Sequence, residues 1–274
     1  MNQEQLSCPI ELAFSLRQRD RRDELGLFLT EGVRALCRAR NQGLAIQQIL
    51  VYPKELNSPR GQILLRQLKR EGVPVLKIKA GPYRSLIQSS QPQGVIAILE
   101  QQWRRLDRVV PRKASHWLLV RHIRSPGNFG SMLRTAEASG VSGVILLGTQ
   151  TDPYNPGTVR AAMGSLLSLP FSRANHHEIA QWTFKHRARV YGCSGTGSKP
   201  YNELTLSKRP TLLFLGEERR GLSERDRELC DDFLSIPMTD KVDSLNVSVA
   251  TGIILFEIYK QRGFPGRKEI MNSG

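Results

Sequence analysis

The chain has 274 residues, of which 39% are hydrophobic and 24% charged, so it can form one large domain or two smaller ones with a real core. This composition excludes wholesale disorder, and the lack of an apolar run of about 20 residues excludes an ordinary membrane-spanning helix. The net charge of +15 and the pI near 10.1 indicate a polyanionic partner, most commonly nucleic acid; a generally basic protein without such a partner is the alternative.

The cysteines give no sign of a metal site or a disulfide framework. The four of them are far apart and form no CxxC or Cys/His spacing: Cys8, Cys37, Cys193 and Cys230. The first eleven residues are polar and do not resemble a signal peptide. We therefore expect a cytoplasmic protein with reduced thiols, no bound metal and no membrane attachment.

The first half of the chain alternates helical and strand-like stretches from Gly26 to about Glu100. A proline directly after Ser58 is typical of a helix start. The expected helices cover Val33–Asn41 and Ser58–Gly72, and the expected strands cover Gln48–Tyr52, Val73–Lys79 and Val95–Glu100.

Residues 101–114 differ from what precedes them, because they show no sustained apolar period and Pro111 interrupts them. Their basic residues are Arg104, Arg105, Arg108, Arg112 and Lys113. We interpret this stretch as a linker between two domains. Its charge fits a solvated connector and an RNA contact equally well.

The β/α alternation is stronger in the second half. The expected strands are Trp117–Ile123, Gly143–Leu147, Arg189–Ser194, Thr211–Leu215 and Phe233–Met238. Near-continuous apolar strands separated by helices predict an α/β fold with a parallel sheet that is covered on both faces. Residues 246–262 form the last predicted helix, and residues 264–274 form a polar tail.

In such a sheet ligands bind at the carboxyl ends of the strands, so the strand-to-helix loops are the candidate sites. The absence of GxGxxG and GxxxxGK[ST] argues against an ordinary dinucleotide site and against nucleotide hydrolysis, and no HExxH or GxSxG is present. Three loops are rich in glycine and polar residues: Ser125–Thr135, Gly216–Ser223 and Ile236–Ala250. Each alone could be a turn or a helix cap, but turns do not explain their shared order and spacing.

These three loops resemble the three motifs of the SpoU (TrmH-like) family of RNA ribose 2′-O-methyltransferases. The first motif matches at Asn128, Gly130, Arg134, Thr135, Ala136 and Gly140, the second at Gly216, Glu218 and Gly221, and the third at Ile236, Pro237, Met238, Ser244, Leu245, Asn246, Val247 and Ala250. Other stretches similar to the family are Pro156 with Val159–Gly164, Phe28–Gly32 and Gln91–Val95. The chain departs from the family at Arg121, Ser125 and Glu217, which bears on the substrate more than on the reaction.

The resemblance implies two α/β domains. Residues 1–100 would form an L30e-like domain that binds the RNA substrate, and residues 101–114 the basic linker. Residues 115–264 would form the SpoU methyltransferase domain of the SPOUT superfamily, with a parallel sheet and a deep trefoil knot, and residues 265–274 the tail.

The resemblance also implies S-adenosylmethionine as the cofactor, without a metal. The cofactor's adenine and ribose would be held around Gly216, Ile236 and Leu245, with Thr196 and Met238 nearby. Apolar walls and backbone groups suit a flat adenine. For Ile236 and Leu245, plain core packing is the alternative.

Arg134 would be the catalytic residue. Because an arginine stays protonated, we expect it to stabilise negative charge on the 2′-oxygen rather than to act as a base. The structural alternative is an ion pair with Glu137 or Glu218.

The remaining catalytic assignments are positioning roles that the resemblance implies. Asn128 and Asn246 would position the ribose or phosphate, although Asn246 could instead only cap the last helix. Glu218 would orient Arg134 or Asn128, and Ser244 would be a further polar contact.

The last predicted helix carries two apolar stripes, Val247/Ala250/Ile254 and Val249/Ile253/Phe256. One stripe suffices for a helix that covers a monomer, so the second indicates burial against a further partner. The resemblance implies that this partner is a second subunit, in a homodimer.

The expected partner is RNA. The basic residues that precede the first domain would contribute to binding it: Arg17, Arg19, Arg21 and Arg22. We predict methylation of 23S-type rRNA, because minimal tRNA-acting relatives often lack the L30e-like domain. The alternatives are a tRNA substrate and a catalytically silent RNA-binding or assembly factor on the same fold.

Overall fold

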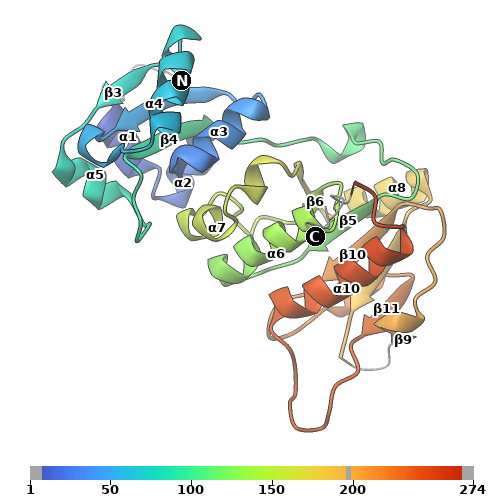
Figure 1. Cartoon of the computed structure of the whole chain (residues 1–274). Coiled ribbons are helices and arrows are strands. Elements are labelled where there is room, and N and C mark those ends of the chain that lie inside the picture. The colour runs from blue at the N-terminus through green and yellow to red at the C-terminus, as the bar shows by residue number, and fades with distance from the viewer. Residues whose placement is uncertain (1–7, 196–198, 267–274) are drawn as a thin grey trace, which may run out of the picture. The chain divides into compact units, whose positions relative to one another are not determined.

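A computed structural model describes residues 8–195 and 199–266 (Figure 1). The chain forms two compact units. The first contains the residues up to Gln102 together with Asp152–Ser168, and the second contains Trp103–Thr151 and the residues from Leu169 onward. The chain therefore passes from one unit to the other after Gln102, after Thr151 and after Ser168.

The N-terminal unit is built on a four-stranded mixed sheet. Its strands lie in the order β1 (Leu27–Glu31), β4 (Val95–Glu100), β2 (Ile46–Val51) and β3 (Val75–Lys77). β4 pairs antiparallel with β1 and β2, whereas β2 and β3 are parallel. The helices of this unit are α1 (Pro9–Ser15), α2 (Arg19–Leu25), α3 (Val33–Asn41), α4 (Pro59–Arg70), α5 (Ala80–Leu86) and α7 (Pro156–Ala161).

Local sequence explains several of these elements. The helix expected over Val33–Asn41 and the strand expected over Val95–Glu100 are confirmed with those bounds. The Ser58 side chain accepts a hydrogen bond from the Gly61 N–H, and Pro59 occupies the first turn, so α4 begins as predicted.

Residues 152–168 complete the interior of the N-terminal unit. The Arg22 guanidinium is 2% exposed and donates to the Asp152 carboxylate and to the carbonyl oxygens of Leu16 and Arg17. The ring of Tyr154 lies 4.6 Å from that of Phe28 between centroids. Arg22 is thus an interior ion-pair residue, and the expectation that it contacts RNA is wrong.

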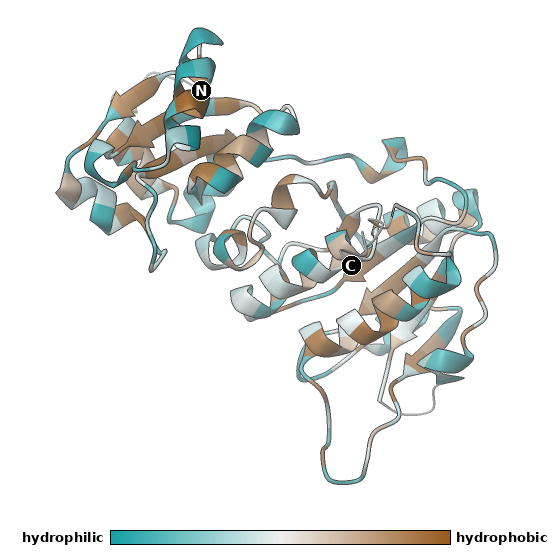
Figure 2. Ribbon diagram, in the orientation of Figure 1, coloured by the Kyte–Doolittle hydropathy of each residue, from teal (hydrophilic) through white to brown (hydrophobic). Residues whose placement is uncertain are grey.

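The C-terminal unit contains the parallel sheet that the sequence predicts. The strand order is β7 (Phe171–Ala174), β6 (Val144–Leu147), β5 (His116–Val120), β10 (Thr211–Leu215), β8 (Arg189–Cys193), β11 (Asp232–Ser235) and β9 (Lys199–Pro200). In the described part of the chain, each neighbouring pair is parallel. β5 and β10 are buried along their whole length, and Figure 2 shows hydrophobic colour along the strands. The helices of this unit are α6 (Pro126–Ala138), α8 (His176–His186), α9 (Glu224–Arg227) and α10 (Val247–Gln261).

From Trp103 onward, the predicted linker is an ordered edge of the C-terminal unit. Trp103 forms a β-bridge with Phe171, and the Arg104 N–H donates to the Phe171 carbonyl at 2.8 Å. Leu106 is buried in the core of this unit, and the Trp182 indole donates to the carbonyl of Val109 at 2.8 Å. These contacts hold the basic segment in one conformation.

α10 uses one apolar face within the chain. It packs against α6, and its residues Ile254, Leu255 and Ile258 are buried. Val249 and Phe256, from the second predicted stripe, are 51% and 45% exposed. This second face is uncovered in the single chain.

Candidate functional site

Three loops meet at the carboxyl edge of the parallel sheet. They follow β5, β10 and β11, and the strand order places β10 beside β5 and one strand away from β11. In Figure 1 the longest of them descends from β11 and returns to the start of α10. Because parallel strands end at the same edge, the three family-like motifs share one region of the molecule.

A chain of hydrogen bonds joins one residue from each motif. The Asn128 side-chain Nδ2 donates to Glu218 Oε1 at 2.7 Å, and Asn246 Nδ2 donates to Asn128 Oδ1 at 3.1 Å. The other oxygen of Glu218 accepts from the Arg124 backbone N–H at 3.1 Å. Of the two partners considered for Glu218, the structure thus brings Asn128 to it.

The same asparagines are tied to helix N-termini. The Ser125 side chain caps α6 by accepting from the Asn128 N–H at 3.3 Å. Asn246 Oδ1 caps α10 by accepting from the Ser248 N–H at 2.8 Å. Asn246 therefore caps a helix with its oxygen and reaches Asn128 with its nitrogen. The capping role is confirmed, whereas the positioning of a ribose or phosphate stays a prediction.

Gly216 closes the loop after β10 tightly upon itself. A Cβ on Gly216 would lie 2.2 Å from the carbonyl carbon of Gly221, which no side chain tolerates. Glu217 and Gly221 face each other across two backbone hydrogen bonds of 2.8 Å. Glycine at position 216 thus lets the backbone fold back directly beside Glu218.

The predicted cofactor residues present apolar surface near this loop edge. Ile236 directly follows β11 and is half-buried, as is Leu245, whereas Met238 is 40% exposed. Apolar side chains that remain partly open suit the adenosyl group of S-adenosylmethionine better than core packing does. Thr196, the remaining predicted cofactor residue, lies outside the described residues.

Arg134 does not belong to the hydrogen-bonded chain. It follows Asn128 by six residues on α6, a rise of about 9 Å, and its side chain is exposed. Within residues 8–195 and 199–266 no hydrogen bond or ion pair joins it to Glu218. Ser244 is likewise exposed.

A buried carboxylate near the carboxyl end of β5 was missed by sequence reasoning. Asp226 is 1% exposed, accepts from the Ser223 hydroxyl at 2.6 Å, and contacts His176 Nε2 at 2.8 Å and Arg121 Nε at 3.7 Å. Burial acts to raise the pKa of Asp226, but the hydrogen bonds from Ser223 and His176 and the charge of Arg121 lower it below its ordinary value. The capping-box spacing of Ser223 and Asp226 is the signal that could have found it.

Comparisons with known proteins agree with this geometry. Residues 115–256 match the SpoU rRNA Methylase family, and residues 10–97 match the MRM3-like substrate binding domain. The chain belongs to the SpoU rRNA methylase family. The resemblance inferred from the motifs is confirmed.

Several relatives are similar to this SpoU-family protein over most of its length. A 23S rRNA (uridine(2479)-2′-O)-methyltransferase of Streptomyces viridochromogenes is 33% identical over 255 residues, covering 90% of this chain and 87% of the relative. The crystal structure of the AdoMet-bound rRNA methyltransferase from Sinorhizobium meliloti superimposes with a TM-score of 0.84 at 30% identity, covering 93% and 95% of the two chains. The SpoU methyltransferase AviRb from Streptomyces viridochromogenes, in complex with AdoMet, gives 0.82 at 31% identity, covering 94% and 98%.

Two negative observations apply to the described residues. None of their helices is both long and apolar enough to cross a bilayer. Among the same residues, no three His, Cys, Asp or Glu side chains gather as a metal site would require. That the reaction needs no metal stays a prediction.

Proposed function

We propose that this protein transfers the methyl group of S-adenosylmethionine to a ribose 2′-hydroxyl of 23S-type ribosomal RNA. The observation that carries the proposal is the hydrogen-bonded chain of Glu218, Asn128 and Asn246, which joins all three family motifs. Relatives named as 23S rRNA 2′-O-methyltransferases, and similar structures determined with AdoMet, support the reaction and the cofactor.

The residues divide into two groups by their chemistry. Gly216, Ile236 and Leu245, with Met238 and Thr196 nearby, would hold the cofactor, which supplies an electrophilic methyl group. Asn128 and Asn246 would bind the ribose or its phosphate, because both carry amide groups in partly or fully exposed side chains. Glu218 fixes the Asn128 amide, since a carboxylate only accepts hydrogen bonds and so holds the NH₂ group toward itself.

Arg134 would supply positive charge to the 2′-oxygen as its proton is lost. Its guanidinium is exposed, so it can reach a bound RNA without first leaving an interior partner. A guanidinium remains protonated in proteins, which favours charge stabilisation over proton abstraction.

The active form would be a homodimer that buries the exposed stripe of α10. Val249 and Phe256 support this assembly, because large apolar side chains on one uncovered helix face favour a partner. We also propose that the backbone near the three loops forms the trefoil knot that the family resemblance implies.

Two features of the chain favour an RNA substrate: its positive net charge and its N-terminal domain. The net charge of +15 favours a polyanion, and the N-terminal match is to a substrate-binding domain. With ribosomal RNA as its substrate, the protein would act in the cytoplasm.

Methylation of purified RNA tests the function. The full chain, labelled S-adenosylmethionine and protein-free 23S-type rRNA should yield a single ribose that resists alkaline cleavage. Asn128→Ala should abolish most of this signal, whereas Asn202→Ala, an exposed asparagine outside the three motif loops, should not. Methylation of tRNA but not of rRNA would show that the substrate is tRNA. Binding of RNA without methylation of any RNA would favour the catalytically silent RNA-binding factor.

A further inference from the structure

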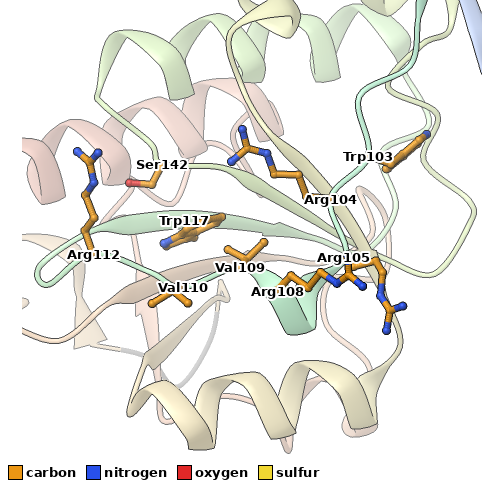
Figure 3. A pocket seen from close by; sticks show the side chains of 9 residues that line it. All are labelled: Trp103, Arg104, Arg105, Arg108, Val109, Val110, Arg112, Trp117 and Ser142. Atoms are coloured by element: carbon orange, nitrogen blue, oxygen red, sulfur yellow. The ribbon is translucent and has the colours of Figure 1, made fainter.

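A second candidate binding site lies on the C-terminal unit, away from the three loops. It is a cavity of about 620 Å³ whose lining comes from the segment before β5, from β5 itself and from the approach to β6. Its lining residues are Trp103, Arg104, Arg105, Arg108, Val109, Val110, Arg112, Trp117 and Ser142 (Figure 3). Trp117 is near the start of β5 and Ser142 precedes β6, so the cavity is at the amino edge of the sheet.

The cavity is strongly cationic. Four of its nine lining residues are arginines and none is acidic. Arg105 is paired with Asp107 at 2.7 Å, but within residues 8–195 and 199–266 the guanidinium groups of Arg104, Arg108 and Arg112 have no hydrogen-bond or ion-pair partner. The Asp107 carboxylate, which also feels the charge of Arg108, offsets part of the positive charge of these four arginines. The excess of positive charge favours a polyanion, because a bound polyanion relieves the repulsion among the guanidinium groups.

The arginines are carried by anchored backbone. The bridge from Trp103 to Phe171, the burial of Leu106 and the hydrogen bond from Trp182 to Val109 hold the segment against the sheet. A ligand that meets an ordered segment loses less conformational entropy on binding than one that must order a flexible linker.

An apolar patch lies between the charges. In Figure 3, Arg112 and Ser142 occupy one end of the view and Trp103 and Arg105 the other, with Trp117 and the two valines between them. Val110 is 76% exposed, so its apolar side chain is open to a ligand. A groove with cations along its length suits the backbone of a single RNA strand, and the apolar middle offers a base or ribose a surface to contact.

We propose that this cavity binds the phosphodiester backbone of the RNA substrate, with a base or ribose against Val110, as a second contact surface distinct from the methyl-transfer site. The inference rests on the proposed function, because the RNA bound in the cavity is the RNA that is methylated. β5 separates the two sites by the length of five residues, roughly 16 Å, and a folded ribosomal RNA is large enough to contact both.

The test is salt-dependent binding of protein-free 23S-type rRNA to the full chain. The variant Arg104→Gln/Arg108→Gln/Arg112→Gln should lower the slope of log affinity against log salt by about 2 to 3, since each phosphate contact contributes roughly 0.7–0.9. It should raise KM for RNA while kcat at saturating RNA stays unchanged. The matched control, Lys185→Gln/Arg187→Gln/Arg225→Gln, removes three exposed charges of the same unit outside the cavity and should retain the wild-type slope.

Val110→Glu provides a second variant with little risk to folding, because this side chain is largely exposed. It should weaken RNA binding while the affinity for S-adenosylhomocysteine, measured by calorimetry, stays unchanged. The inference would be overturned if the triple variant in the cavity and the triple control variant had equal salt slopes. It would also be overturned if the cavity variant lost binding to ribosomal particles but bound protein-free rRNA as the wild type does. A wild-type protein that methylates no RNA, yet binds it through these arginines, would overturn the proposed function and leave the inference standing.

Discussion

Asn128 lies between a carboxylate and a second amide, and this fixes the direction of its own side chain. Glu218 takes the NH₂ group, which leaves Oδ1 to accept from Asn246. A polar group held from both sides is pre-organised, so it loses little entropy when substrate binds. Position 128 thus converts three loops from distant parts of the sequence into one site.

The first prediction concerns Arg134. Arg134→Ala should leave the affinity for S-adenosylmethionine nearly intact and reduce single-turnover methylation by roughly a hundred- to a thousand-fold, the usual cost of losing one pre-organised electrostatic partner. Arg134→Lys should recover part of the rate, because it retains the charge without the planar fork. Rates at saturating RNA, measured for the three proteins, decide the matter. An alanine variant as fast as the wild type would remove Arg134 from the mechanism.

The second prediction concerns the pH dependence of folding. His116 is 3% exposed and its Nε2 lies 2.7 Å from the Ser139 carbonyl oxygen; burial lowers the pKa of this histidine. The unfolded chain, with a histidine pKa of about 6.5, therefore binds more protons than the native chain as the pH falls below that value, and stability decreases. Urea unfolding at pH 7, 6 and 5 should show a smaller decrease for His116→Gln than for the wild type. His177→Gln, a change at an exposed histidine, should behave like the wild type.

At the residue scale the motifs predicted which loops come together, and local sequence failed where the interaction partner was distant in the chain. Asn128, Glu218 and Asn246 meet as the motif order implied. Arg22 looked like a solvated cation because nothing near it in sequence reveals that Asp152 will neutralise it. A long-range ion pair leaves no local pattern.

Among the helices and strands, α10 has an apolar face, with Val249 and Phe256, that nothing in the described part of the single chain covers. The third prediction is that Phe256→Asp gives a monomer by light scattering, because it places a charge in the proposed dimer interface, where Phe256 is 45% exposed in the single chain. The control is Phe184→Asp on α8, where the aromatic ring is 88% exposed, and this variant should remain a dimer. A dimeric Phe256→Asp protein would exclude this face as the interface.

Element prediction followed the strength of the apolar pattern. β10 (TLLFL) was predicted with its observed bounds, because five consecutive apolar or small residues fit a strand buried on both faces. β7 (FSRA) was not predicted, since Ser172 and Arg173 interrupt the pattern. Arg173 is accommodated by stacking on Trp103 at 4.4 Å, a contact that depends on the remote segment before β5.

For the whole molecule, the fourth prediction concerns the interrupted N-terminal unit. A fragment of residues 1–102 lacks Asp152 and Tyr154, which leaves the Arg22 charge without its carboxylate and uncovers Phe28. Breaking a buried ion pair costs about 3–5 kcal/mol, a large part of the stability of a small domain. Chemical denaturation should therefore show this fragment far less stable than a fragment in which residues 152–168 are fused to it by a Gly/Ser linker. Equal stability of the two fragments would mean that the segment is dispensable.

The domain division at residues 100 and 115 stays a prediction. The family matches cover 10–97 and 115–256, whereas contacts group residues 152–168 with the N-terminal unit. Sequence patterns show where a helix such as α4 forms but not which neighbour a helix packs against, because amphipathic faces are alike in different domains.

Because residues 103–151 of the second unit separate the two parts of the first unit in the sequence, they also set an order of events during synthesis. A nascent chain leaves the ribosome N-terminus first, at about 5–20 residues per second, so the fifty residues from Gln102 to Asp152 add roughly 3–10 s before Asp152 follows the rest of the first unit. During that interval the Arg22 charge and the Phe28 ring have no cover. Cotranslational folding of the first unit must wait for a segment encoded within the second.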